Sequence, residues 1–97
     1  MQTQHSGSAL LTADGVVLQS GKPTRLFAIH IISGAGGGGV IDLYNGTAST
    51  DTLYIKEQGT ANGGKNILYG DQGFFFPAGL YCDLDANTTS VLFEISQ

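Results

Sequence analysis

The segment from Thr24 to Asn45 constrains the fold more than any other part of the chain. Residues 24–32 (TRLFAIHII) are almost all β-branched, aromatic or otherwise apolar, residues 33–39 (SGAGGGG) are mostly glycine, and residues 40–45 (VIDLYN) begin a new apolar segment with alternation. A run so rich in glycine supports no regular structure, whereas β-branched and aromatic residues favour strands. We predict a central pair of strands joined by a flexible loop.

The side chains of residues 24–32 divide into two faces, because successive residues of a strand point in opposite directions. One predicted face carries Leu26, Ala28, His30 and Ile32, and the other carries Arg25, Phe27, Ile29 and Ile31. Both faces are mostly apolar. This pattern predicts a central strand that is covered on both sides.

The rest of the chain predicts shorter strands separated by turns. The turn signal Asp14-Gly15 predicts that residues 16–19 return as a strand alongside residues 9–12. Further strands are expected at residues 52–57, 66–69, 74–77, 80–84 and 89–95. About eight short strands without any helical periodicity predict an all-β fold, namely one antiparallel, jelly-roll-like β-sandwich spanning residues 1–97, with residues 1–8 as an N-terminal arm.

Composition argues against several classes of partner. Only four residues are Lys or Arg and the net charge is −4, so the chain offers no basic surface for nucleic acid or for an anionic membrane. No apolar run approaches the roughly 20 residues that span a bilayer. The first seven residues lack the features of a signal peptide, and Cys82 has no second cysteine to pair with, so we expect synthesis in a reducing compartment without export.

Two glycine-rich segments imitate nucleotide-binding motifs. Gly34, Gly36 and Gly39 have the spacing of a dinucleotide fingerprint, and residues 59–66 (GTANGGKN) nearly match a P-loop. Both motifs require a helix immediately afterwards, because the phosphates bind at its N-terminus. Strands are predicted after both segments, so we expect no cofactor.

Candidate metal and catalytic residues are few. Asp83, Asp85, Asn87 and Glu94 have the spacing of calcium-loop ligands, but the strand predicted at residues 89–95 carries Glu94 away, so a hairpin turn is favoured and calcium remains an open alternative. His5 and His30 are too few for a zinc site without carboxylates. A nucleophilic pair of Cys82 and His30 is the basis of the least favoured hypothesis, a small enzyme.

The triplet Phe74-Phe75-Phe76 is the most unusual apolar feature, because alternate rings of a strand point to opposite faces. Either the strand is buried on both faces, or the triplet anchors a protein–protein interface, where aromatic residues are enriched. The exposed tyrosines suggest a different class of function, a carbohydrate- or receptor-binding module, through Tyr44, Tyr54, Tyr69 or Tyr81.

Three segments carry a resemblance to a known group of proteins. They are residues 25–46 (RLFAIHIISGAGGGGVIDLYNG), 57–70 (EQGTANGGKNILYG) and 73–86 (GFFFPAGLYCDLDA). Together they resemble small all-β virion proteins of tailed bacteriophages, particularly marine and environmental phages, which combine a strand, a small-residue loop, an L-x-N-G turn and a late G-L-Y-x-x-L strand. The resemblance covers about two-thirds of the chain and implies no catalytic residues.

The resemblance implies a non-enzymatic structural component of a virion, made in the host cytoplasm, and most simply a capsid decoration or cement protein. Its expected partners are the major capsid protein or another virion protein, together with further copies of itself. Low charge suits a subunit of a symmetric assembly. The predicted interface residues are Gln2, Gln4, Gly36, Gly37, Gly38, Phe74, Phe75 and Phe76. The alternatives are a neck, tail or fibre component and the carbohydrate- or receptor-binding module.

Overall fold

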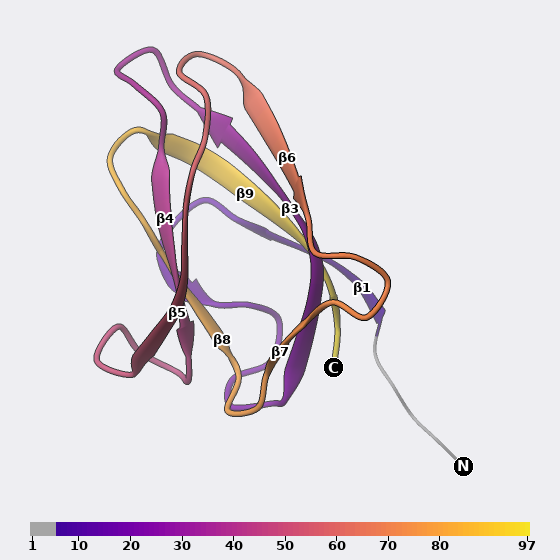
Figure 1. Cartoon of the computed structure of the whole chain (residues 1–97). Coiled ribbons are helices and arrows are strands. Elements are labelled where there is room, and N and C mark those ends of the chain that lie inside the picture. The colour runs from indigo at the N-terminus through magenta and orange to yellow at the C-terminus, as the bar shows by residue number, and fades with distance from the viewer. Residues whose placement is uncertain (1–5) are drawn as a thin grey trace.

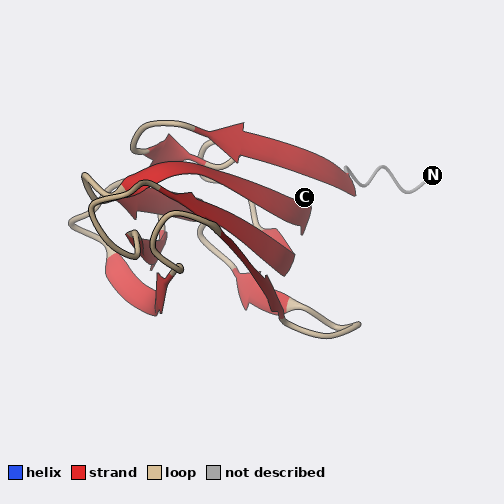
Figure 2. Cartoon of the chain, turned by 90° about the horizontal axis from the view of Figure 1, so that it is seen from above, coloured by secondary structure: helices blue, strands red, loops and turns tan. Residues whose placement is uncertain are grey.

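The structure, a computed structural model, describes residues 6–97 and is an antiparallel β-sandwich of two sheets (Figures 1 and 2). Sheet A has the order β1 (Ser6–Leu11), β9 (Thr88–Ser96), β3 (Thr24–Ser33) and β6 (Gly64–Leu68), and β7 (Phe74–Phe76) also pairs with β3. Sheet B has the order β2 (Gly15–Val16), β8 (Leu80–Leu84), β4 (Val40–Asn45) and β5 (Thr52–Gln58). The predicted all-β sandwich is confirmed, with nine strands in the described chain.

The core lies between the two sheets and is built from alternate residues of both. Sheet A contributes Leu26, Ile29, Ile31, Val91, Phe93 and Ile95, and sheet B contributes Ile41, Leu43, Leu80 and Cys82. All of these side chains are at most 2% exposed. Burying one large apolar side chain stabilises a fold by about 1.5–3 kcal/mol, so this layer holds the sheets together.

The strands pair in the order of a long hairpin that has been rolled up. The first strand pairs with the last, β2 pairs with β8, and β4 pairs with β5. Between these pairs, β6 and β7 bind successive parts of β3 and together occupy one strand position. This scheme is consistent with the expected jelly roll.

Two predicted strand pairs are wrong. The segments 24–32 and 40–45 do not pair with each other, because β3 lies in sheet A and β4 lies in sheet B. The predicted return strand at residues 16–19 is only two residues long and joins sheet B, whereas β1 pairs with β9 in sheet A. In both places the chain crosses between the layers, which lets the apolar faces of both segments share one core.

The first crossing is held by hydrogen bonds to β8. Asp14 Oδ1 accepts a hydrogen bond of 2.7 Å from the backbone N–H of Leu84. The backbone N–H of Val17 donates to the carbonyl of Leu80 at 2.8 Å, and the Val17 side chain is fully buried. Asp14-Gly15 therefore marks a change of sheet and not a hairpin turn.

The glycine-rich crossing between β3 and β4 is packed and hydrogen-bonded within the chain. The backbone N–H of Gly39 donates to Ser33 Oγ at 2.9 Å, and that of Gly34 donates to the Asn87 carbonyl at 2.8 Å. A side chain on Gly38 would collide with the carbonyl oxygen of Gly59, and one on Gly39 would lie 2.8 Å from Thr88 Cα. The loop was predicted to be flexible, but its glycines instead permit a close approach of backbones.

A β-bulge at Phe27 changes which residues of β3 face the core. The register with β9 shifts between Leu26 and Ala28, so that Leu26 and Ile29 both point inward. The predicted faces are right within residues 28–32 but wrong across the bulge, where Leu26 shares a face with Ile29 and not with Ala28. The reason is that a bulge inserts one extra residue into the alternation. Among the described residues, no second sheet covers the outer face of β3.

We predict that Gly39→Ala destabilises the fold by about 1–3 kcal/mol, as overpacking of a closely packed site does. Its new methyl group would meet Thr88, whereas the same change at Gly63, whose nearest neighbour is Ala61 O at 3.9 Å, is the control. Urea unfolding followed by circular dichroism measures both. Equal stability of the two variants would contradict the packed crossing.

Candidate functional site on the outer face of sheet A

The outer face of sheet A exposes several large apolar side chains. Leu10 on β1 is 62% exposed, Ile32 on β3 is 44% exposed, and Leu68 on β6 is 76% exposed. The core-facing residues of β9 are Val91, Phe93 and Ile95, so their neighbours in the sequence and the partners of those neighbours face outward. A sheet face in water is normally polar, so this face is a candidate contact surface.

His30 lies in the middle of this face, in a row with Leu10, Leu92 and Asn66 on the adjacent strands. Its Nδ1 is 2.6 Å from Asn66 Oδ1, and its Nε2 is 2.6 Å from Glu94 Oε2. Both ring nitrogens thus face oxygen acceptors. Only the doubly protonated imidazolium can donate to both at once.

Hydrogen bonding to Glu94 raises the pKa of His30 above its usual value of 6.5, and the bond to Asn66 adds to this effect. Slight burial of the ring acts in the opposite direction. His30 was expected to be a hydrogen-bonded core or interface residue. It is hydrogen-bonded, but its side chain is 27% exposed and lies outside the core.

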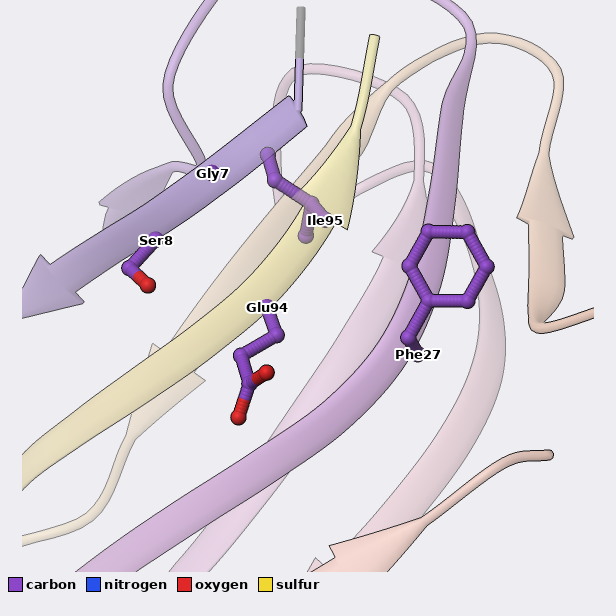
Figure 3. A pocket seen from close by; sticks show the side chains of 5 residues that line it. All are labelled: Gly7, Ser8, Phe27, Glu94 and Ile95. Atoms are coloured by element: carbon purple, nitrogen blue, oxygen red, sulfur yellow. The ribbon is translucent and has the colours of Figure 1, made fainter. Parts of the chain in front are cut away.

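A shallow hollow of about 280 Å³ lies beside Glu94 on the same face. It is lined by Gly7 and Ser8 of β1, Glu94 and Ile95 of β9, and Phe27 at the bulge of β3. Figure 3 shows the Glu94 carboxylate between Ser8 on one side and the Phe27 ring on the other. The hollow therefore combines an apolar wall with one carboxylate.

The structure divides the predicted Phe74–Phe76 interface. Phe76 is fully buried and belongs to the core, so its ring is removed from any intermolecular surface. Phe74 is partly exposed and packs on Tyr54, Tyr69 and Phe76, with ring centroids 5.3–6.4 Å apart. The triplet is therefore buried on its inner face, at Phe76, and not on both faces.

Phe75 is the most exposed of the three, and it faces outward beside Arg25 on the neighbouring strand. The Arg25 guanidinium carbon lies 4.9 Å from the centre of the Phe75 ring, and Arg25 Nη1 donates to the carbonyl of Gln72. Phe75 stays a predicted contact residue.

Two of the candidate tyrosines help to close the side of the sandwich. Tyr54 projects from β5 of sheet B and packs on Phe74 and Phe76 of β7. The Tyr69 hydroxyl donates to Glu57 Oε2 at 2.8 Å, which joins the segment after β6 to β5. Burial is the main cause of the raised pKa of Tyr69. These two side chains therefore serve the fold.

The three glycines that were predicted as interface residues lie in the loop between β3 and β4, near Asn87 and Gly59. Gly36 is exposed, whereas Gly37 and Gly38 are partly buried. Gln2 and Gln4 lie outside the described residues. Of the predicted arm at residues 1–8, residues 6–8 belong to β1 and pair with β9. The role of the glycines as contacts stays a prediction.

The residues with calcium-loop spacing are used in different ways. Asp85 Oδ1 accepts hydrogen bonds of 3.0 Å from the Asn87 N–H and from Thr88 Oγ1, which forms the tight turn between β8 and β9. Glu94 instead contacts His30 on the outer face of sheet A. Among residues 6–97, no three His, Cys, Asp or Glu side chains are grouped so that they could hold a metal ion.

Cys82 and His30 do not form a catalytic pair. Cys82 is fully buried in the core on β8 of sheet B, whereas His30 points outward from β3 of sheet A. Burial strongly raises the pKa of the Cys82 thiol. The thiol is therefore protonated and shielded at neutral pH, which is the opposite of an activated nucleophile.

The outer face of sheet B has a different chemistry. Tyr44 and Tyr81 lie side by side on β4 and β8, with ring centroids 6.2 Å apart. In the next row, Asp42 forms an ion pair of 2.8 Å with Lys56, and Asp83 lies opposite Asp42. Desolvation, followed by the nearby charge of Asp14, raises the pKa of Asp83. This face is acidic and aromatic.

Comparisons of the chain with protein-family models, with curated proteins and with solved structures gave no match. In the described part of the chain, no helix is long and apolar enough to cross a membrane.

Sequence reasoning singled out His30 but missed its partners. Asn66 and Glu94 are 36 and 64 residues away from it in the sequence. Only the pairing of β3 with both β6 and β9 brings the three side chains together. The sequence pointed to His30 only because it is a polar residue within an otherwise apolar strand.

We predict that Glu94→Gln lowers the pKa of His30, because it removes the carboxylate that favours the imidazolium. A proton NMR titration of the assigned His30 ring resonance measures this change, and Glu57→Gln is the control. Because the folded pKa is raised above 6.5, the ion pair stabilises the fold fully below that pH and the effect is lost as pH rises through the folded value. A titration that is identical in wild type and Glu94→Gln would refute the pairing.

We predict that the Cys82 thiol reacts with a disulfide reagent at pH 8 no faster than the chain unfolds. The buried, protonated thiol must be exposed before it can ionise and attack. Absorbance at increasing urea concentrations measures the rate, and the fully unfolded protein serves as the control. Rapid reaction of the native protein would contradict a buried thiol.

Proposed function

We propose that this chain is a structural subunit of a tailed-phage virion, most simply a capsid decoration or cement protein, which associates with itself and with the major capsid protein. The observation that carries the proposal is the outer face of sheet A, with Leu10, Ile32 and Leu68 exposed on a continuous sheet surface. Burying such side chains against a partner supplies the main driving force of association.

The balance of charges on this face supports the same proposal. On this face, Leu10 and Leu92 lie side by side on β1 and β9, and Leu92 lies opposite His30 on β3. His30 and Glu94 compensate each other as an ion pair. Because these two charges are paired with each other, a partner that covers this part of the face does not have to bury an unpaired charge.

The strand pairing and the edge of sheet A add further support. A scheme consistent with a jelly roll is found in viral capsid and lectin domains, although a fold alone does not specify a function. The edge strand β1 (SGSALL) contains no Lys, Pro or other residue that commonly protects an edge against pairing. In an assembly such an edge is available for contact with a neighbouring subunit.

We predict that Leu68→Asp weakens self-association about tenfold or more, because association would bury an unpaired charge in an apolar interface. Leu53→Asp is the control, because Leu53 is also an exposed leucine but lies on sheet B. Light scattering after size-exclusion chromatography measures the oligomeric state, and co-sedimentation with capsids measures binding to the shell. A wild-type protein that is monomeric and does not bind capsids would sink this proposal.

A second candidate function is the binding of a saccharide on the outer face of sheet B. The adjacent Tyr44 and Tyr81 rings could stack on a sugar, and Asp42 and Asp83 in the next row could accept hydrogen bonds from its hydroxyl groups. Of the four candidate tyrosines, these two lie next to each other on the outer face of sheet B, whereas Tyr54 packs on Phe74 and Phe76. Binding of glycans that is lost in Tyr81→Ala would favour this function.

A further inference from the structure

The residues that line the hollow beside Glu94 are suited to bind a long cationic side chain. The Phe27 ring supplies a wall on which an aliphatic stem can pack and over which a cation is attracted. Glu94 supplies the negative charge, and Ser8 lies directly opposite Glu94 on the adjacent strand. Gly7 also lines the hollow and contributes no side chain to it.

One oxygen of the Glu94 carboxylate remains available. His30 binds Oε2, and among the described residues no hydrogen bond is formed to Oε1. An ionised carboxylate has about four lone-pair sites, so it can accept from a second donor while the contact with His30 persists.

None of the chain's four Lys and Arg residues lines the hollow. Three of them have partners elsewhere: Arg25 stacks on Phe75, Lys56 pairs with Asp42, and Lys65 donates to the Gln58 carbonyl. With only four Lys and Arg residues and a net charge of −4, the chain attracts basic partners. A cation that enters the hollow comes most readily from another protein.

We propose that this hollow receives a lysine or arginine side chain of a partner protein, with its stem on Phe27 and its charged end at Glu94 Oε1. This inference deepens the proposed function and rests on it for the identity of the partner, because the hollow lies on the same face as the apolar contact surface. It assigns to that partner a basic residue that projects into the interface.

The groups around Glu94 make this binding dependent on pH. Ser8 faces it from β1 and His30 faces it from β3, and His30 is itself bound by Asn66 of β6. A protonated His30 neutralises the carboxylate and competes with the incoming cation. Binding in the hollow therefore strengthens as pH rises through the His30 titration.

The test is an NMR titration of the full chain, labelled with ¹⁵N, with N-acetyl-lysine methylamide. The matched probe is N-acetyl-norleucine methylamide, which has the same kind of stem without the ammonium group. We expect saturating shifts of the amides of Gly7, Ser8, Phe27 and Glu94 with the lysine probe. Equal shifts with the norleucine probe, or no shift at these amides, would overturn the proposal.

Two variants sharpen the test. Glu94→Gln should weaken binding of the lysine probe by about threefold or more, as expected when a solvent-exposed ion pair is removed. Phe27→Ala removes the ring on which the stem of the lysine packs and should also weaken binding. Glu57→Gln should have no effect. Unchanged binding in both Glu94→Gln and Phe27→Ala would refute the assigned position.

The hollow and the proposed function can fail separately. Leu68→Asp should lose self-association and still bind the lysine probe within about twofold of wild type, because Leu68 does not line the hollow. A protein that binds the probe at these amides but never assembles would keep the hollow and overturn the proposed function. A protein that assembles but does not bind the probe at these amides would keep the proposed function and overturn the hollow as a cation site.

Discussion

The two sheets depend on each other for burial, and the close packing of backbone at the glycine crossing allows them to meet. β3 leaves sheet A and the chain enters sheet B within six residues, Gly34–Gly39, between the Gly59 loop and the Asn87 turn. Side chains at Gly38 and Gly39 would collide with Gly59 and Thr88. These contacts hold three connections together at one end of the sandwich (Figure 1).

The bulge at Phe27 links this architecture to the candidate site. In an unbroken strand, His30 would share a face with Leu26 and would point into the core. The extra residue turns Ile29 and Ile31 inward and places His30 outside, within reach of Glu94 and Asn66. The bulge also places Phe27 beside the hollow. One bulge therefore positions both His30, with its hydrogen bonds, and the Phe27 wall of the hollow. Bulges often occur next to functional sites.

Strand positions were largely predictable from the sequence, whereas strand partners were not. Alternating apolar residues bounded by glycine identified residues 40–45 and 80–84 correctly. Alternation indicates that one face of a strand is buried. A hairpin partner in the same sheet and a crossing to the opposite sheet bury that face equally well. The predicted pairing of residues 24–32 with residues 40–45 was wrong for this reason. The bulge carries no local signal, so the outward position of His30 and its contact with Glu94 could not be predicted either.

The two outer faces of the sandwich differ in a way that bears on function. Sheet B presents Tyr44, Tyr81 and a row of acidic residues, which remain favourable in water. Sheet A presents exposed leucines around the ion pair of His30 and Glu94. Covering these leucines with a partner is favourable, because it removes apolar surface from water. In the proposed assembly, the subunit would lie on a larger surface with sheet A and present sheet B outward. The apolar face would then supply affinity, and the carboxylate of Glu94 at its hollow would select a partner with a matching cation.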